Sequence, residues 1–321
     1  MPEETGTELG ASERVSSLPR LSLNGDAMPR RPSRALALLR TARPRQWVKN
    51  VLVAAAPGAA GVLSHGHALL DTFIAFAAFT LGAAGTYFLN DAFDVEADRR
   101  HPTKRRRPVA AGLVGVTTAK VVGAVLIVAA VGVGFAADWR LPVVIACYVM
   151  MTTSYSMWLK HVAVLDLGMV AAGFVLRMIA GAVAVDVPIS NWFFIVASFG
   201  SLFVVAGKRL AEHRELGASR ADVRSTLAQY TTAYLGHVTA VSSAVTMVAY
   251  CLWAFERARG HAGVPWFELS IVPFVLGVLR YALVLESGGG AAPEEIVLGD
   301  RALQLMGLAW VIVVAIGIYV A

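Results

Sequence analysis

Long apolar segments recur along this chain from about residue 47 to its last residue. Each approaches the roughly 20 residues that an α-helix needs to cross the hydrocarbon core of a bilayer. Only 16% of the residues are charged, whereas a soluble domain carries about 25% charged residues. We therefore expect an all-α, polytopic membrane protein rather than a soluble domain.

The apolar segments predict about nine transmembrane helices. Eight is the alternative, because the loops near 255–264 and 286–301 have too balanced a charge to indicate a side of the membrane. The expected spans are roughly 46–64, 68–90, 116–136, 141–159, 162–185, 190–207, 233–254, 265–285 and 302–321.

Positive charges collect in alternate connections, a pattern typical of loops that remain in the cytoplasm. The opposite loops hold little charge, namely Asp138 with Arg140, and Asp186. We therefore expect the N-terminus and the loops after the second, fourth and sixth spans to be cytoplasmic. The basic residues concerned are Arg34, Arg40, Arg43, Arg45, Lys49, Arg99, Arg100, Lys104, Arg105, Arg106, Arg107, Lys160, Lys208, Arg209, Arg214, Arg220 and Arg224.

The segment 1–33 is rich in Glu, Ser, Pro and Arg and has no apolar core. A secretory signal peptide requires a hydrophobic stretch of roughly 7–15 residues. We therefore expect 1–33 to be a disordered cytoplasmic tail. The transmembrane domain is expected to occupy 34–321.

Four polar side chains cluster at the end of the second expected span: Asn90, Asp91, Asp94 and Asp98. On a helix their spacing places all four on one face. Like charges at this spacing repel one another, so the stripe needs a cation. Mg²⁺ prefers oxygen ligands and commonly combines one or two protein carboxylates with water and substrate phosphate. The stripe therefore predicts a Mg²⁺ site, with a solvated helix end as the alternative.

The loop 101–108 follows the acidic stripe directly and reads His-Pro-Thr-Lys-Arg-Arg-Arg-Pro. Two prolines bracket four consecutive cations, which predicts a turn. Alone, these cations could serve only to set topology. Beside a metal site they predict a diphosphate site, because Lys and Arg can bind the phosphate oxygens that the metal does not coordinate.

Further polar residues lie where the cytoplasmic ends of the spans should meet. Asp166 and Arg177 are eleven residues apart within the fifth span and share a face, so an internal ion pair is the alternative to a functional role. The residues that we expect to bind substrate are Gln46, Lys49, Lys104, Arg105, Arg107, Tyr155, Lys160, Arg177, Lys208 and Arg209.

The pattern Asn-Asp-x-x-Asp-x-x-x-Asp, followed by a polar loop after the sixth span, resembles the UbiA superfamily of intramembrane prenyltransferases over residues 40–321. The resemblance implies a helical bundle around a cytoplasm-facing cavity, with Asp91, Asp94 and Asp98 as catalytic residues that hold a diphosphate through Mg²⁺. Typical members carry a second acidic motif after the sixth span. Here 208–212 reads Lys-Arg-Leu-Ala-Glu, which indicates more substrate phosphate to neutralise.

The segments 43–50 (Arg-Pro-Arg-Gln-Trp-Val-Lys-Asn) and 101–108 are similar to one branch, the decaprenyl-phosphate phosphoribosyltransferases of mycobacteria and their relatives. This resemblance implies transfer of 5-phosphoribosyl from phosphoribosyl pyrophosphate to decaprenyl phosphate, a step toward the arabinose donor for cell-wall arabinan. The implied location is the bacterial plasma membrane. We expect the two substrates, Mg²⁺ and membrane lipids as partners, and no nucleic acid. The sequence leaves open whether the chain forms a homo-oligomer.

The chemistry of ribosyl transfer agrees with these residues. Departing pyrophosphate must be stabilised, water must be excluded, and an anionic acceptor needs no general base. Two alternatives remain: a UbiA-type prenyltransferase with an aromatic acceptor, and a lipid-phosphate transporter. Transporters tend to bind at the bilayer midplane between repeats, whereas these charges gather at one face. Lys208 and Arg209 distinguish the two enzymes.

Overall fold

The computed structural model describes residues 33–216, 226–259, 263–288 and 293–320. Contacts within the chain divide it into Met1–Ser33 and Arg34–Ala321, and every helix of the described residues belongs to the second unit. The predicted tail, apart from Ser33, and the loop cations Arg220 and Arg224 lie outside the described residues, so the expectations for them stay predictions.

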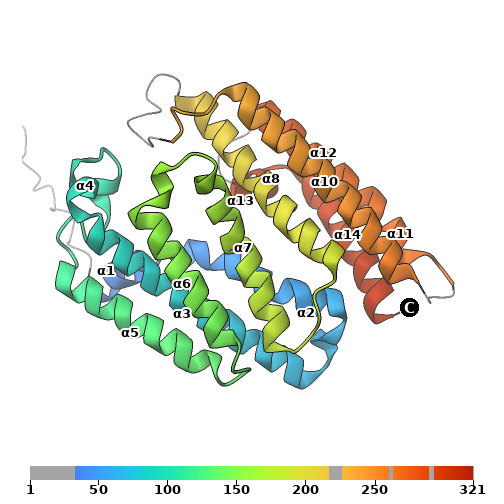
Figure 1. Cartoon of the computed structure of the whole chain (residues 1–321), viewed down its shortest axis with the longest axis horizontal. Coiled ribbons are helices and arrows are strands. Elements are labelled where there is room, and N and C mark those ends of the chain that lie inside the picture. Colours follow the sequence, from blue (N-terminus) through green and yellow to red (C-terminus); the bar gives the residue numbers. More distant parts are fainter. Residues whose placement is uncertain (1–32, 217–225, 260–262, 289–292, 321) are drawn as a thin grey trace, which may run out of the picture. The chain divides into compact units, whose positions relative to one another are not determined.

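Every regular element in the described ranges is a helix, and these ranges contain no strand (Figure 1). The predicted all-α membrane fold is confirmed, and the protein is a multi-pass membrane protein. Within the described ranges seven helical segments are long and apolar enough to cross a membrane. They are α3 (Gly66–Phe93), α5 (Val116–Gly134), α7 (Leu165–Ala184), α8 (Asn191–Leu216), α10 (Thr232–Ala258), α11 (Trp266–Leu269) continued by α12 (Ile271–Glu286), and α14 (Arg301–Tyr319).

The two other expected spans have a different form. α6 (Leu141–Met157) is apolar but has 17 residues. The first expected span consists of the 3-10 helix η1 (Pro44–Ala54), α2 (Ala55–Ala60) and η2 (Val62–Ser64). A 3-10 helix rises about 2.0 Å per residue and an α-helix about 1.5 Å, so η1 and α2 together reach roughly 31 Å, close to a bilayer core. The count of nine spans therefore stays a prediction.

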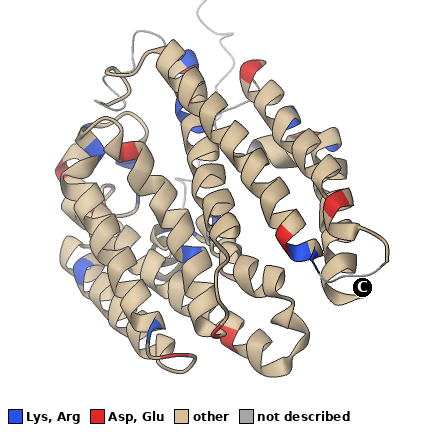
Figure 2. Cartoon of the chain, turned by 45° about the vertical axis from the view of Figure 1, so that its right-hand side comes forward, with Lys and Arg blue, Asp and Glu red and all other residues tan. Residues whose placement is uncertain are grey.

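Short helices lie at the ends of the spans. They are α1 (Arg34–Thr41), α4 (Val95–Arg100), η3 (Lys104–Arg106), η4 (Leu159–His161) and α13 (Pro293–Gly299). Most charged residues lie near helix ends, and long uncharged stretches separate them (Figure 2). Arg140, for example, joins the connection before α6 to the one after α7 through Asp186, at 2.7 Å. This distribution keeps charge away from the lipid-facing middle of the bundle.

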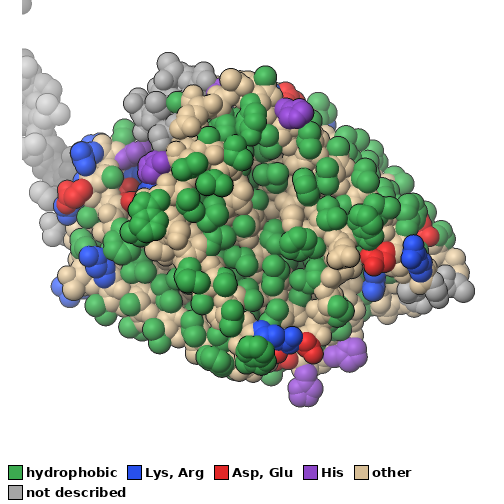
Figure 3. Space-filling model, viewed as in Figure 1, with side chains coloured by type: hydrophobic (Ala, Val, Ile, Leu, Met, Phe, Trp, Pro, Cys, Tyr) green, Lys and Arg blue, Asp and Glu red, His purple; other side chains and the backbone are tan. Residues whose placement is uncertain are grey.

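α7 is the central helix of the arrangement, because it packs against α3, α6, α8 and η1. α3 and α5 pack closely through Gly85: a Cβ there would lie 2.8 Å from the carbonyl oxygen of Gly123. α5 and α14 are little buried, and the visible surface is largely hydrophobic (Figure 3). Apolar side chains on the outside are expected where the solvent is lipid.

Candidate active site

The acidic stripe lies at a junction between two helices. α3 ends at Phe93, α4 begins at Val95, and Asp94 connects them with φ −88° and ψ 6°. The amide of Asp94 donates to the carbonyl of Asn90 at 2.9 Å, and the amide of Asp98 donates to the carbonyl of Asp94 at 2.8 Å. The predicted single helix is therefore wrong in this detail, although helical hydrogen bonding continues through the junction.

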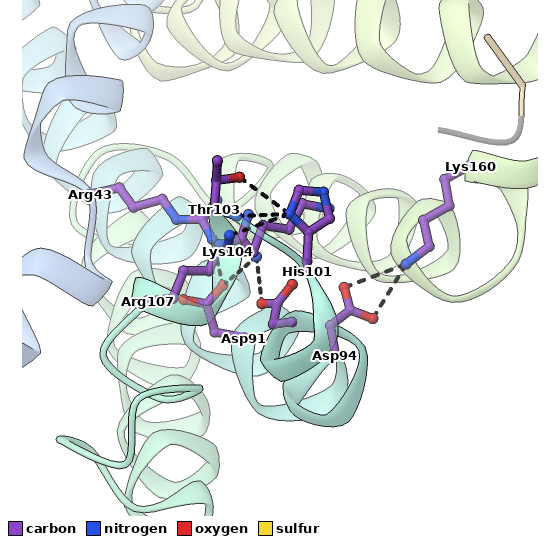
Figure 4. A network of polar contacts seen from close by, with 9 residues as sticks. Arg43, Asp91, Asp94, His101, Thr103, Lys104, Arg107 and Lys160 are labelled. Carbon is purple, nitrogen blue, oxygen red and sulfur yellow. Dashed lines mark hydrogen bonds and ion pairs between the residues drawn. The ribbon is translucent and has the colours of Figure 1, made fainter. Parts of the chain in front are cut away.

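Arginines neutralise the two buried carboxylates of the stripe (Figure 4). Asp91, whose side chain is 2% exposed, accepts hydrogen bonds from Arg43 and, at 3.2 Å, from Arg107. The same Nη1 of Arg107 lies 2.7 Å from Oδ2 of Asp98. These ion pairs remove much of the repulsion between the carboxylates of the stripe. From the sequence, we had expected a metal cation to balance this repulsion. Arg107, a predicted substrate ligand, is thus placed directly over the stripe.

Arg43 belongs to this network but was not among the predicted site residues. Its backbone is left-handed, with φ 53°, and its guanidinium lies 4.6 Å from the centre of the Tyr87 ring. A residue before a proline, here Pro44, normally prefers an extended backbone. No sequence signal therefore indicated that the side chain of Arg43 turns toward Asp91.

Asp94 has a more open environment than Asp91. Its side chain is 36% exposed, and its two carboxylate oxygens lie 3.3 and 3.4 Å from the ammonium of Lys160. Lys160 belongs to η4, far away in the sequence, and reaches toward Asp94 across the site (Figure 4). The structure thus brings together two predicted site residues and leaves the carboxylate of Asp94 accessible.

The basic loop folds back toward the stripe. The Nδ1 atom of His101 accepts from the amides of Thr103 at 3.3 Å and Lys104 at 3.4 Å, which fixes the turn. Lys104 is half-buried beside the network, whereas Arg105 is exposed (Figure 4 shows Lys104). Of the predicted loop cations, Arg107 therefore contacts the acidic residues, and Lys104 lies half-buried beside them.

A second buried polar cluster occupies the place of the missing acidic motif. Asp166 is fully buried and accepts from Tyr230, from Thr226 at 3.4 Å and from Arg209 at 3.4 Å. Arg209 also donates to Glu212 at 2.7 Å. The Tyr230 hydroxyl accepts from the amide of Val164, at 2.7 Å. Burial raises the pKa of Tyr230, so this hydroxyl stays protonated and can donate to Asp166.

Lys208 differs from its neighbour Arg209. Its side chain is 39% exposed, and its ammonium is 3.8 Å from Glu212. Tyr155 interacts electrostatically with Arg209, and Lys160, five residues later, contacts Asp94. The C-terminal end of α6, which carries Tyr155, and the connection that follows it, which carries Lys160, therefore link the second cluster to the acidic stripe.

Arg177 and Asp166 do not pair, so the internal ion pair considered from the sequence is wrong. Arg177 is buried and donates to Oδ1 of Asn50 at 2.8 Å, to the carbonyl of Gly173 at 2.6 Å and to the hydroxyl of Tyr148 at 3.1 Å. Its guanidinium thus joins α7 to η1 and α6. Sequence spacing identified a shared helix face but could not identify the partners.

An apolar cavity of about 790 Å³ lies beside η1 and α2, within the usual size range for ligand pockets. Its lining includes Leu52 and Ala55 together with Phe174, Trp253 and Trp310. In its wall, the hydroxyl of Tyr319 donates to the carbonyl of Gly58 at 3.3 Å, which joins α14 to α2. The lining is almost entirely apolar, which suits a hydrocarbon chain.

The stripe offers oxygen donors that fit Mg²⁺. Among the described residues, no group of three or more His, Cys, Asp or Glu is arranged to hold a metal by itself. Mg²⁺ does not require such a group, because it binds through one or two carboxylates and shares phosphate oxygens with its substrate. Asp94, half-exposed, and the amide of Asn90 are suitable donors, whereas Asp91 and Asp98 are engaged by arginines.

The model of the UbiA prenyltransferase family matches residues 51–297. The chain is 40% identical to a decaprenyl-phosphate phosphoribosyltransferase of Corynebacterium glutamicum, over 95% of this chain and 94% of the relative. It is 42% identical to the protein of that name from Mycolicibacterium smegmatis, over 88% and 92% of the two chains. A solved UbiA homologue of Archaeoglobus fulgidus, bound to GPP and Mg²⁺, has a similar fold, with TM-score 0.66 and 17% identity over 88% and 98% of the chains.

Proposed function

The chain belongs to the UbiA prenyltransferase family, and from this premise we propose that it transfers 5-phosphoribosyl from phosphoribosyl pyrophosphate to decaprenyl phosphate. The relatives from Corynebacterium glutamicum and Mycolicibacterium smegmatis bear the name of this activity and match nearly full length, which supports the proposal. The products are decaprenylphosphoryl-5-phosphoribose and pyrophosphate, a step toward the arabinose donor of cell-wall arabinan.

The observation that carries the proposal is the basic cluster after the sixth expected span. Arg209 is buried against Asp166 and Glu212, and Lys208 remains accessible beside it. A second acidic motif that clamps a metal is thereby replaced by cations. Cations at this place suit a donor or acceptor with an additional phosphate, such as the 5-phosphate of phosphoribosyl pyrophosphate.

The reaction breaks the bond between C1 of the ribose and the pyrophosphate oxygen, whose electron pair leaves with pyrophosphate. An oxygen of the lipid phosphate forms the new bond to C1. Because that oxygen is already anionic, no residue has to remove a proton. Lys104, Arg105, Arg107 and Lys160 bind the departing pyrophosphate, and Lys208 binds the 5-phosphate.

Asn90 and Asp94 hold Mg²⁺ in this proposal, with Asp91 and Asp98 as further ligands or as anchors for Arg43 and Arg107. Bound Mg²⁺ supplies positive charge to the pyrophosphate as it departs. The Mg²⁺-bound fold neighbours from Archaeoglobus fulgidus support the use of a divalent metal.

The lipid enters sideways between the helices, because its tail is insoluble in the cytoplasm. The apolar cavity beside η1 receives the part of the tail nearest the phosphate. Lys49 and Gln46 lie on η1 and bind the lipid phosphate, and Tyr155 orients the groups between the two clusters. The site faces the cytoplasm, and the protein resides in the bacterial plasma membrane with a cytoplasmic N-terminus.

The direct experiment supplies the purified protein with phosphoribosyl pyrophosphate labelled in the ribose, decaprenyl phosphate and Mg²⁺. Transfer produces a labelled, organic-soluble lipid, and omission of decaprenyl phosphate abolishes it. If label never enters the lipid fraction although the protein is folded, the proposal is wrong.

A further inference from the structure

The 3-10 helix η1 is unusually long for its type. It contains 11 residues, whereas 3-10 runs beyond three or four residues are uncommon. With three residues per turn, side chains at i and i+3 align, so η1 has three rows of side chains. The first row is exposed at Arg45, Val48 and Val51, and the second is half-buried at Gln46, Lys49 and Leu52. The third row becomes fully buried at its later members, Asn50 and Val53.

The half-buried row leads directly into the apolar cavity. Leu52 and Ala55, its later members, line the cavity, with Val51 and Ala54 beside them. Lys49 precedes Leu52 by one 3-10 turn, a rise of roughly 6 Å. In this row, polar Gln46 and Lys49 are followed by apolar Leu52 and Ala55. Lys49 is therefore the last polar residue before the cavity.

A buried hydrogen-bond network holds η1 in place from the opposite side. Asn50 accepts from Nε of Arg177 at 2.8 Å and donates to the hydroxyl of Thr80 at 3.0 Å. Arg177 also donates to the hydroxyl of Tyr148, and its guanidinium lies 5.4 Å from the centre of the Phe79 ring. A buried cation is costly unless its donors are satisfied. These contacts therefore resist rotation of η1.

The backbones of η1 and α7 also approach closely beyond this network. A Cβ at Gly181 would lie 1.7 Å from the carbonyl oxygen of Val53, which no side chain could accommodate without movement. Gly168, on the same helix, has no neighbouring atom within 4 Å of an added Cβ. The two glycines thus provide a matched pair for displacing η1 without altering a polar group.

We propose that Asn50 and Arg177 are positioning residues that hold the three-residue register of η1 and thereby set Lys49 at the cavity mouth, where it binds the phosphate of a lipid acceptor. In an α-helix, residues at i and i+3 differ by roughly 60° in direction, so Lys49 would leave the row of Leu52. That the lipid is a polyprenyl phosphate rests on the proposed function. Arg177, expected from the sequence to bind substrate, thus acts through Lys49.

The test measures binding of decaprenyl phosphate and of decaprenol to the protein in nanodiscs, without the ribosyl donor. The difference between the two lipids isolates recognition of the phosphate. Asn50→Leu removes both hydrogen bonds, whereas Asn50→Asp keeps an oxygen for Arg177 and should restore binding. Gly181→Ala displaces η1 independently, and Gly168→Ala is its control. Lys49→Met removes the phosphate ligand itself.

We expect wild type, Asn50→Asp and Gly168→Ala to prefer the phosphate. Lys49→Met, Asn50→Leu and Gly181→Ala should lose that preference by roughly tenfold or more, as for a lost hydrogen bond to a charged group. In the transfer assay, Asn50→Leu and Gly181→Ala should raise KM for the lipid and leave KM for the donor unchanged. A purely structural role would instead reduce the active fraction and leave both KM values unchanged.

Three results would overturn the inference. They are equal binding of the two lipids by wild type, an unchanged preference in Lys49→Met, and an unchanged preference in either folded variant, Asn50→Leu or Gly181→Ala. The binding arm is independent of the ribosyl donor. If the expected binding differences are found while no phosphoribosyl transfer occurs, the proposed function fails and the positioning role stands.

Discussion

The ammonium of Lys160 lies 3.3 Å from Oδ1 of Asp94, although 66 residues separate the two in the chain. Their contact joins the α3–α4 junction to the connection between α6 and α7, so both face the same site. Asp94 is also the most accessible carboxylate of the three in the stripe. This accessibility is what the proposed binding of Mg²⁺ at Asp94 requires.

Asp94→Asn should lower kcat/KM by orders of magnitude while the protein still folds, because the amide is a much weaker ligand for Mg²⁺. EDTA should abolish wild-type activity. Glu96→Gln is the matched control, since Glu96 lies on α4 but is exposed, and its carboxylate forms an ion pair with Arg99 at 2.8 Å. Full turnover of verified metal-free protein would contradict the metal assignment.

A double-mutant cycle separates metal binding from the Lys160 ion pair. If Asp94 only paired with Lys160, then Asp94→Asn, Lys160→Met and the double variant would have equal effects. We expect Asp94→Asn to lower kcat further than Lys160→Met, and the double variant to be worse than either. Steady-state kinetics with phosphoribosyl pyrophosphate measure the three effects.

Arg107→Met should destabilise the protein by roughly 3 kcal/mol, because it leaves two buried carboxylates, Asp91 and Asp98, short of a partner. Arg106→Met, an exposed neighbour in the same loop, should change stability by less than about 0.5 kcal/mol. Unfolding followed in detergent measures both. Equal stability of the two variants would mean that the loop and stripe are not coupled in the folded protein.

Lys208 and Arg209 should have opposite roles despite their adjacency. Lys208→Met should raise KM for a phosphorylated substrate by roughly 10- to 150-fold, the loss of a charge-assisted hydrogen bond, with little change in stability. Arg209→Met should instead lower the melting temperature, since it leaves Asp166 buried without its cation. Unchanged KM values for both substrates in Lys208→Met would indicate that the charge of Lys208 only sets the orientation of the chain in the membrane.

Acid should weaken the ion pair at the opposite end of the bundle. Hydrogen bonding to Arg140 lowers the pKa of Asp138 below its ordinary value of 3.8. The stabilisation is therefore complete above about pH 3.8 and is lost as pH falls through the lower, folded-state pKa. The melting temperature of Asp138→Asn should lie below that of wild type at pH 6, and the difference should shrink toward pH 3.

The sequence predicted the all-α fold with its long apolar helices, and the grouping of the acidic stripe, because both depend on short-range regularities: apolar length for a span, and spacing of three and four residues for the stripe. It did not predict the 3-10 form of Pro44–Ala54. The same apolar residues can form either helix type, and the choice depends on packing against α7, where Gly181 admits the carbonyl of Val53.

The sequence also could not identify which side chains on different helices contact one another. Eleven-residue spacing placed Asp166 and Arg177 on a common face, yet each binds a different helix, Asp166 to Arg209 and Arg177 to Asn50. Which helices adjoin α7 is set by the tertiary arrangement. Arg43 was missed for a related reason, because its contact with Asp91 depends on a left-handed backbone that no residue type in the segment requires.

The most direct test of the assignment offers the purified protein two substrate pairs side by side, both with Mg²⁺, and measures pyrophosphate release. One pair is phosphoribosyl pyrophosphate with decaprenyl phosphate, and the other is a prenyl diphosphate with an aromatic acid. We predict pyrophosphate release with the first pair only, and only when the lipid is present. Release with the second pair only would contradict it and assign the protein to prenyl transfer.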